Sequence, residues 1–86
     1  MSSPTLELFH RIADPQSATA RRFVTDHQLE DRVRFRNLTY PEVEADWRRL
    51  GGQSSPALWD GTHLHQGAEA VVARLLAVVN LGRDAS

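Results

Sequence analysis

The sequence predicts an α/β fold in which a four-stranded mixed sheet is flanked by three helices, in the order βαβαββα. Apolar runs with the two-residue period of strands alternate along the chain with runs that have the 3.6-residue period of helices. The opening strand, helix and strand require a right-handed crossover, which makes the first two strands parallel. An Asp-Gly pair between two later strand-like runs predicts a hairpin, which adds antiparallel strands to the sheet.

The first strand and the first helix are expected before residue 30. Residues 5–10 form a short apolar run with one charge, which is typical of a strand that is covered on both faces. Asp14 followed by Pro15 provides an N-cap side chain and a proline at the first helical position. We therefore expect a helix over residues 15–28, because four side chains recur at helical spacing on one face: Ala20, Phe23, Val24 and His27.

The middle of the chain predicts a second strand and a short second helix. Residues 33–38 alternate apolar and basic side chains, so Val33 and Phe35 should share a buried face. Arg34 and Arg36 should form the opposite, solvated face near a sheet edge, although arginine is also suited to bidentate carboxylate recognition. Thr39 and Glu42 match a capping box that opens a helix through Val43, Trp47 and Leu50, and Gly51-Gly52 should end it.

The last third of the chain predicts a hairpin and a final helix. Residues 57–59 and 62–65 read as antiparallel strands joined by Asp60-Gly61. His63 and His65 should share one face of the last strand, where two imidazoles without a third ligand make only half a metal site, so we expect no bound metal. A helix should follow, with Gly82 as its stop, because the apolar positions from Ala68 to Val79 form a wide stripe: Val71, Val72, Leu75, Leu76 and Val79.

Composition limits the classes of function. The 86 residues should form one domain with an ordered core at about residues 5–80 and tails at 1–4 and 81–86. The chain contains ten arginines, no lysine and eleven acidic residues, and the net charge of −1 argues against a nucleic-acid partner. We see no membrane span or targeting segment and expect a cytoplasmic protein. The absence of cysteine excludes disulfides and any thiol chemistry of this chain.

Three stretches carry a resemblance to a known family. They are Asp14-Pro15-Gln16-Ser17 with Ala20 downstream, Ser55-Pro56-Ala57-Leu58, and the hairpin from Asp60 that leads into Gln66-Gly67-Ala68-Glu69. In order and spacing they resemble three parts of the glutaredoxins and of the related amino-terminal domain of glutathione transferases. These parts are the Cys-Pro-x-Cys-x-x-Ala helix start, the Val-Pro-x-Leu strand start with its cis proline, and the hairpin with the glutathione-clamping helix start. The resemblance covers residues 6–79 and implies a minimal thioredoxin fold.

The chain departs from this family at both cysteine positions, which hold Asp14 and Ser17. Dithiol and monothiol mechanisms are therefore excluded, and we expect no catalytic residue. A helix N-terminus favours an aspartate by roughly 0.3–1 kcal/mol, so we interpret Asp14 as an N-cap.

The resemblance implies a domain without redox activity that binds glutathione, a γ-glutamyl compound, an extended peptide or a protein partner. The groove would lie between the first helix and the proline loop, where the Ser55 amide and carbonyl would pair with an extended ligand. No cofactor is expected beyond glutathione as a possible ligand. The ligand-binding residues implied are Asp14, Ser17, Ser54, Ser55, Pro56, Gly67, Ala68 and Glu69.

Two alternatives stay open. The first is a glutathione-transferase-like enzyme, in which the Ser17 hydroxyl would activate glutathione and His10 with Asp14 would complete a triad. The second is a structural assembly module with a vestigial groove. Trp47 and Trp59 are expected in the core or in the groove wall, and Arg48 and Arg49 lie where the family's second helix assists a glycine carboxylate.

Overall fold

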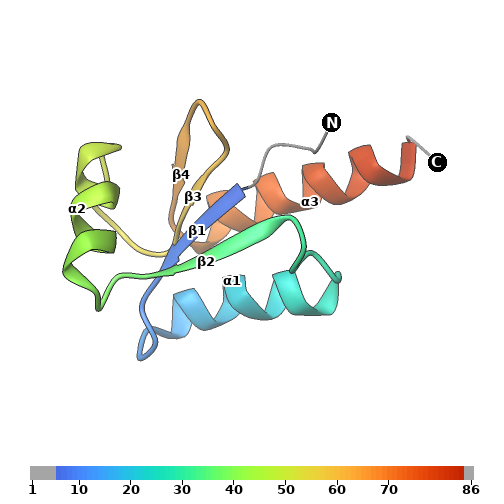
Figure 1. Cartoon of the computed structure of the whole chain (residues 1–86). Coiled ribbons are helices and arrows are strands. Elements are labelled where there is room, and N and C mark those ends of the chain that lie inside the picture. The colour runs from blue at the N-terminus through green and yellow to red at the C-terminus, as the bar shows by residue number, and fades with distance from the viewer. Residues whose placement is uncertain (1–5, 85–86) are drawn as a thin grey trace.

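The computed structural model describes residues 6–84 as a four-stranded sheet with three helices (Figure 1). The elements are β1 (Leu6–His10), α1 (Pro15–Asp26), β2 (Val33–Asn37), α2 (Pro41–Arg49), β3 (Ala57–Trp59), β4 (Leu64–Gln66) and α3 (Ala68–Asp84). The strand order is β2-β1-β3-β4, with β1 parallel to β2 and antiparallel to β3, and β3 antiparallel to β4. This mixed sheet confirms the predicted minimal thioredoxin-like layout. The tail predicted at residues 1–4, together with Thr5 and residues 85–86, lies outside the described residues.

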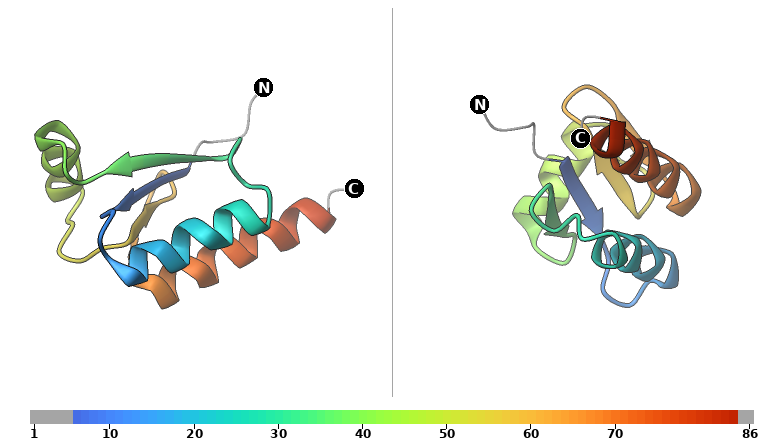
Figure 2. Two further views of the ribbon diagram at one scale, coloured as in Figure 1. Left: turned by 90° about the horizontal axis from the view of Figure 1, so that it is seen from below. Right: turned by 90° about the vertical axis from the view of Figure 1, so that its right-hand side faces the viewer.

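The helices α1 and α3 run side by side along one face of the sheet (Figure 2). Leu8 of β1 and Leu58 of β3 point to this face and are fully buried. Val24 of α1 and the α3 residues Val71 and Leu75 pack against them. This larger core fixes the starts of α1 and α3 relative to the sheet.

The helix α2 covers part of the opposite face. Because side chains alternate along a strand, Phe9 of β1 and Ala57 of β3 point away from α1 and α3. Val43 and Trp47 of α2 pack on them in a second cluster that includes the buried Leu38, and the partly buried Trp59 packs against this cluster. Trp47 is therefore a core residue, and Trp59 lies at the edge of the core.

The boundaries of α1 and α2 differ from the predicted ones. The helix α1 ends at Asp26 rather than at residue 28, because Gln28 adopts a left-handed conformation with φ 55°. The predicted capping box at Thr39 is wrong: Tyr40 is the N-cap of α2, without a side-chain bond, and Pro41 is the first helical residue. The Asn37 side chain instead accepts the Thr39 amide at 2.9 Å and makes a turn before the helix.

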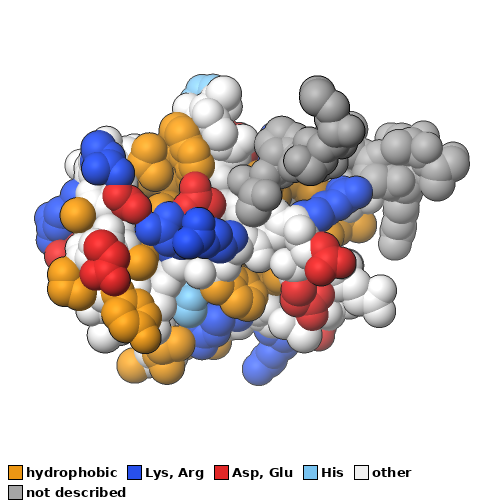
Figure 3. All heavy atoms as spheres, in the orientation of Figure 1, with side chains coloured by type: hydrophobic (Ala, Val, Ile, Leu, Met, Phe, Trp, Pro, Cys, Tyr) orange, Lys and Arg blue, Asp and Glu red, His pale blue; other side chains and the backbone are white. Residues whose placement is uncertain are grey.

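The two faces of β2 also differ from the prediction. Phe35 is 42% exposed, whereas Val33 on the same face of β2 is buried in the core with α1, as predicted. Arg36 is not solvated: its guanidinium binds the carboxylates of Glu7 and Asp46 and lies 5.4 Å from the Phe9 ring centroid. Figure 3 shows acidic and basic side chains side by side on this face. The parallel register sets Glu7 opposite Arg34, so Arg36 reaches Glu7 along the diagonal of the ladder, a contact that period alone does not reveal.

The hairpin and the last helix extend further than predicted. Asp60 accepts the amides of Thr62 and His63, so the turn takes up both residues and β4 begins at Leu64. Gly82 does not end α3, which continues to Asp84 within the predicted tail, since one glycine in a helix costs only about 1 kcal/mol. Among the described helices none is both long and apolar enough to span a membrane.

Candidate functional site

The N-terminus of α1 is built around the Asp14 carboxylate. As its N-cap, Asp14 accepts the backbone amides of Gln16 at 3.2 Å and Ser17 at 3.3 Å. It also accepts the hydroxyls of Ser17 at 2.9 Å and Ser55 at 3.3 Å. Burial opposes ionisation, but these four hydrogen bonds outweigh it and lower the pKa of Asp14. One ionised group therefore links α1 to the proline loop.

The Ser17 hydroxyl is committed to this network. The side chain is fully buried, and its oxygen accepts the Arg11 amide at 3.1 Å while its proton goes to Asp14. The triad with His10 is not assembled, because the His10 Nδ1 faces the Arg21 guanidinium at 3.2 Å. Burial and then the Arg21 charge lower the pKa of His10. Ser17 positions Asp14, and no observation favours an activated hydroxyl.

The loop before β3 is held from several sides, and its Ser55–Pro56 bond is cis. The Gln66 side-chain oxygen accepts the amides of Gln53 at 2.7 Å and Ser54 at 3.0 Å. The Ser54 carbonyl accepts the Trp47 indole N–H at 3.3 Å, and the Pro56 carbonyl accepts the Gly67 amide at 2.8 Å. Among residues 6–84, no group bonds to the amide or the carbonyl of Ser55. The sequence analysis did not single out Gln66, whose role depends on the three-dimensional pairing of β4 with this loop.

An open hollow of about 750 Å³ lies at the start of α3. It includes three predicted site residues, Gly67, Ala68 and Glu69, and also Gln16 of α1. Asp14, Ser17 and Ser55 form the hydrogen-bonded cluster beside the loop and do not line the hollow. The structure therefore places the predicted residues in two groups, and Gln16, which the sequence analysis left out of the site, lies on the hollow side.

Arginines surround Trp47 at the other end of the loop. The Arg11 and Arg48 guanidinium carbons each lie 5.7 Å from the Trp47 ring centroid. Arg48 pairs with Glu44 at 3.6 Å, and Arg49 pairs with Asp46, but both arginine side chains are mostly exposed. These cations are therefore accessible to a ligand carboxylate.

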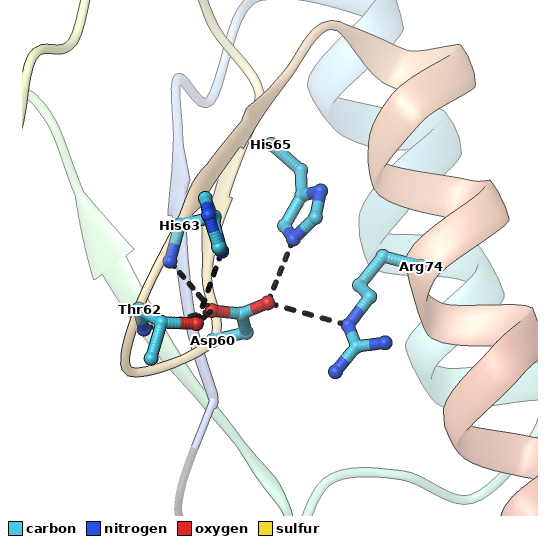
Figure 4. Close-up of polar contacts among 5 residues, drawn as sticks. All are labelled: Asp60, Thr62, His63, His65 and Arg74. Carbon is cyan, nitrogen blue, oxygen red and sulfur yellow. Dashed lines mark hydrogen bonds and ion pairs between the residues drawn. The ribbon is translucent and has the colours of Figure 1, made fainter.

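A second polar cluster lies in the hairpin, around the carboxylate of Asp60 (Figure 4). One oxygen accepts the amides of Thr62 and His63 and the Thr62 hydroxyl. The other lies 2.8 Å from the His65 Nε2 and 3.4 Å from the Arg74 Nε. The bond from His65 is the largest cause of the lowered pKa of Asp60. The described residues hold no group of three or more candidate ligands that could bind a metal ion.

Comparison with known proteins adds no family to this description. No protein-family model matches the chain, and no curated protein matches its sequence. The likeness to the glutaredoxins therefore depends on the three sequence stretches and on a compatible α/β layout.

Proposed function

We propose that this chain is a thioredoxin-like binding domain without redox activity, which binds an extended ligand, a peptide segment or glutathione, along the Ser54–Pro56 loop. The observation that carries the proposal is the backbone of Ser55. Its amide and carbonyl have no partner within residues 6–84, although Ser54 and Pro56 on either side are held by hydrogen bonds. An extended ligand can bond to both groups as an added strand does. Because the loop is already ordered, its binding costs little conformational entropy.

Charge at the site favours particular ligand groups. The pKa of Asp14 is lowered, so its carboxylate stays ionised at neutral pH and would repel a thiolate. A peptide N–H or a protonated thiol could instead donate a hydrogen bond to it. Arg11 and Arg48 beside Trp47 offer cations for a carboxylate at the other end of the ligand. The site therefore suits an extended peptide, or glutathione in its thiol form.

The absence of cysteine supports binding rather than turnover. Thiol-disulfide exchange begins with attack by a thiolate, and this chain contains none. Asp14 occupies one of the positions where a thiol would stand, and its oxygens are used for capping and for holding Ser55. The protein should give no glutathione-dependent reduction of a mixed disulfide above the uncatalysed rate.

A two-dimensional NMR titration with glutathione, its disulfide and a blocked extended peptide tests the proposal. We expect amide shifts at Ser55 and at Gly67–Glu69. Gln16→Trp should narrow the hollow beside Gly67–Glu69 and weaken binding about tenfold, equal to about 1.4 kcal/mol. Thr25→Trp, on the exposed face of the same helix, is the matched control and should leave binding unchanged. Absence of shifts at millimolar concentrations of all three ligands would contradict the proposal and favour the assembly module.

A further inference from the structure

The outer edge of β2 presents unpaired backbone groups centred on Phe35. The Leu6 amide donates to the Arg32 carbonyl, and the Leu38 amide donates to the His10 carbonyl, each at 2.9 Å. In a parallel ladder, alternate residues of one strand bond to the neighbour, so the backbone groups of Arg34 and Arg36 face β1. The amide and carbonyl of Phe35 therefore face outward.

Two further outward groups are free among residues 6–84. The Val33 amide donates a hydrogen bond to the Leu29 carbonyl at 3.0 Å, and the Asn37 carbonyl accepts one from the Tyr40 amide at 3.2 Å. The Val33 carbonyl and the Asn37 amide have no such partner. In the left view of Figure 2 no described helix or strand lies beyond β2. The edge thus offers four groups in the spacing that one added antiparallel strand requires.

The side chains along this edge determine what it can accept. Phe35 is 42% exposed on the face of α1, where its ring meets the His10 ring edge-on at a centroid distance of 5.5 Å. Arg34 is exposed on the opposite face, and no carboxylate of the described residues pairs with it. Arg36 is already neutralised by Glu7 and Asp46. Within β2, Arg34 is therefore the cation that is open to a partner strand.

A second copy of this chain is a poor match for the edge. In an antiparallel pair of β2 strands centred on Phe35, Arg34 of each copy would face an Arg36 that already binds Glu7 and Asp46, so this register offers Arg34 no free carboxylate. A shift of two residues would place Arg34 opposite Arg34. Like charges directly opposite one another destabilise a strand pair, whereas opposite charges stabilise it.

We propose that the β2 edge binds an extended segment of a partner protein that carries an apolar residue opposite Phe35 and an acidic residue opposite Arg34. In an antiparallel addition the apolar residue exchanges both hydrogen bonds with Phe35 and covers its ring. The next residue of the segment is the acidic one, on the opposite face, where its carboxylate reaches the Arg34 guanidinium. This surface is separate from the Ser55 loop, and the inference does not depend on the function proposed above.

The test is an amide-resolved NMR titration with the peptide acetyl-Thr-Thr-Val-Glu-Thr-amide. In antiparallel alignment its valine lies opposite Phe35 and its glutamate opposite Arg34. We expect the largest shifts at the Phe35 and Asn37 amides. The same peptide with lysine in place of glutamate should bind about fivefold more weakly, because an attractive cross-strand pair becomes a repulsive one.

Charge reversal in the protein makes the test specific. Arg34→Glu should reverse the order of the two peptides, whereas Arg22→Glu, an equal charge change at an exposed position of α1, should not. Three outcomes overturn the proposal: no shift at Phe35 and Asn37 at about 10 mM peptide, shifts centred on Ser55 instead, or equal affinity for the two peptides. Concentration-dependent broadening at β2 without peptide would overturn it in favour of self-association.

Discussion

Replacing Asp60 by asparagine should weaken the contact between the β3–β4 hairpin and α3. The Asp60 side chain is 7% exposed, and its two oxygens serve different partners. Asparagine keeps the oxygen that accepts the amides of Thr62 and His63. It puts an N–H₂ group in place of the oxygen that faces His65 and Arg74. The new N–H₂ group and the Arg74 guanidinium are both donors, so they cannot pair with each other.

The expected loss of stability follows from these contacts. The hydrogen bond from His65 to the charged carboxylate contributes about 1.5–3 kcal/mol. The Arg74 Nε is buried and makes an ion pair but no hydrogen bond, so the substitution takes away the charge that faces it. A change of tautomer would let the His65 ring accept the new N–H, which limits the loss. Arg74 is 37% exposed, so water offsets part of its loss. We therefore expect Asp60→Asn to lower the free energy of unfolding by about 2 kcal/mol.

Urea denaturation measures this change, with Asp31→Asn as the control, since Asp31 is exposed and the charge change is equal. With a slope of about 1–3 kcal/mol per molar urea, the midpoint should fall by about 1 M. In an Arg74→Met background the cost of Asp60→Asn should shrink, because no cation is left unpaired. The reasoning would be refuted if Asp60→Asn lowered the free energy of unfolding by less than about 0.5 kcal/mol, or by the same amount in the wild-type and Arg74→Met backgrounds.

The Asp60 carboxylate should also make the free energy of unfolding fall at acid pH. Hydrogen bonds, the one from His65 first, lower the pKa of Asp60 in the folded state. A group with a lowered folded pKa contributes stability above its unfolded value of about 3.9, and this is lost as the pH falls through the folded value. Wild type should therefore lose stability below about pH 4 more steeply than Asp60→Asn. Parallel losses in the two proteins would contradict the shift.

Substitutions at Asp14, Gly52 and Leu58 test other parts of the site and its supports. Asp14→Ala should cost about 0.5–2 kcal/mol in urea, whereas Asp14→Asn, which can still cap α1, should cost less. Gly52→Ala should cost about 1–3 kcal/mol and shift tryptophan emission, because its Cβ would lie 2.4 Å from the Trp47 indole, and Trp47→Phe should relieve part of the cost. Leu58→Ala should cost about 2–5 kcal/mol by calorimetry, because Leu58 is fully buried between the sheet and α3.

The sequence predicts most of this fold because its signals are local and agree with one another. The proline after Asp14, the Asp-Gly turn at residue 60 and the apolar spacing of α3 each define one element. The errors occur where a distant contact decides. The Arg36 guanidinium is not solvated, because it pairs with Glu7 of the neighbouring strand and with Asp46 of α2. Of the two β2 residues predicted to be buried on one face, Val33 reaches the core with α1 and Phe35 stays 42% exposed.

The candidate site divides in the same way. The N-cap role of Asp14 is local, and the sequence predicts it. The bond from Ser55 to Asp14 spans 41 positions of the chain, and Gln66 reaches the amides of Gln53 and Ser54 only because β4 returns beside that loop. Arg74 lies 14 positions beyond Asp60 on another element (Figure 4). No periodicity reveals such pairs, because they depend on how the sheet places its ends.

The Asp14 carboxylate at the start of α1 helps to hold the Ser54–Pro56 loop, in a chain that has no thiol at this position. The N-terminus of a helix stabilises negative charge, and amides that have no partner within the helix need acceptors. Asp14 meets both requirements at once and still accepts the hydroxyls of Ser17 and Ser55. The pKa of Asp14 is lowered because these donors favour its ionised form. The network therefore grows stronger as the carboxylate ionises, and at neutral pH it holds the Ser55 side chain, while the Ser55 amide and carbonyl have no hydrogen-bond partner among residues 6–84.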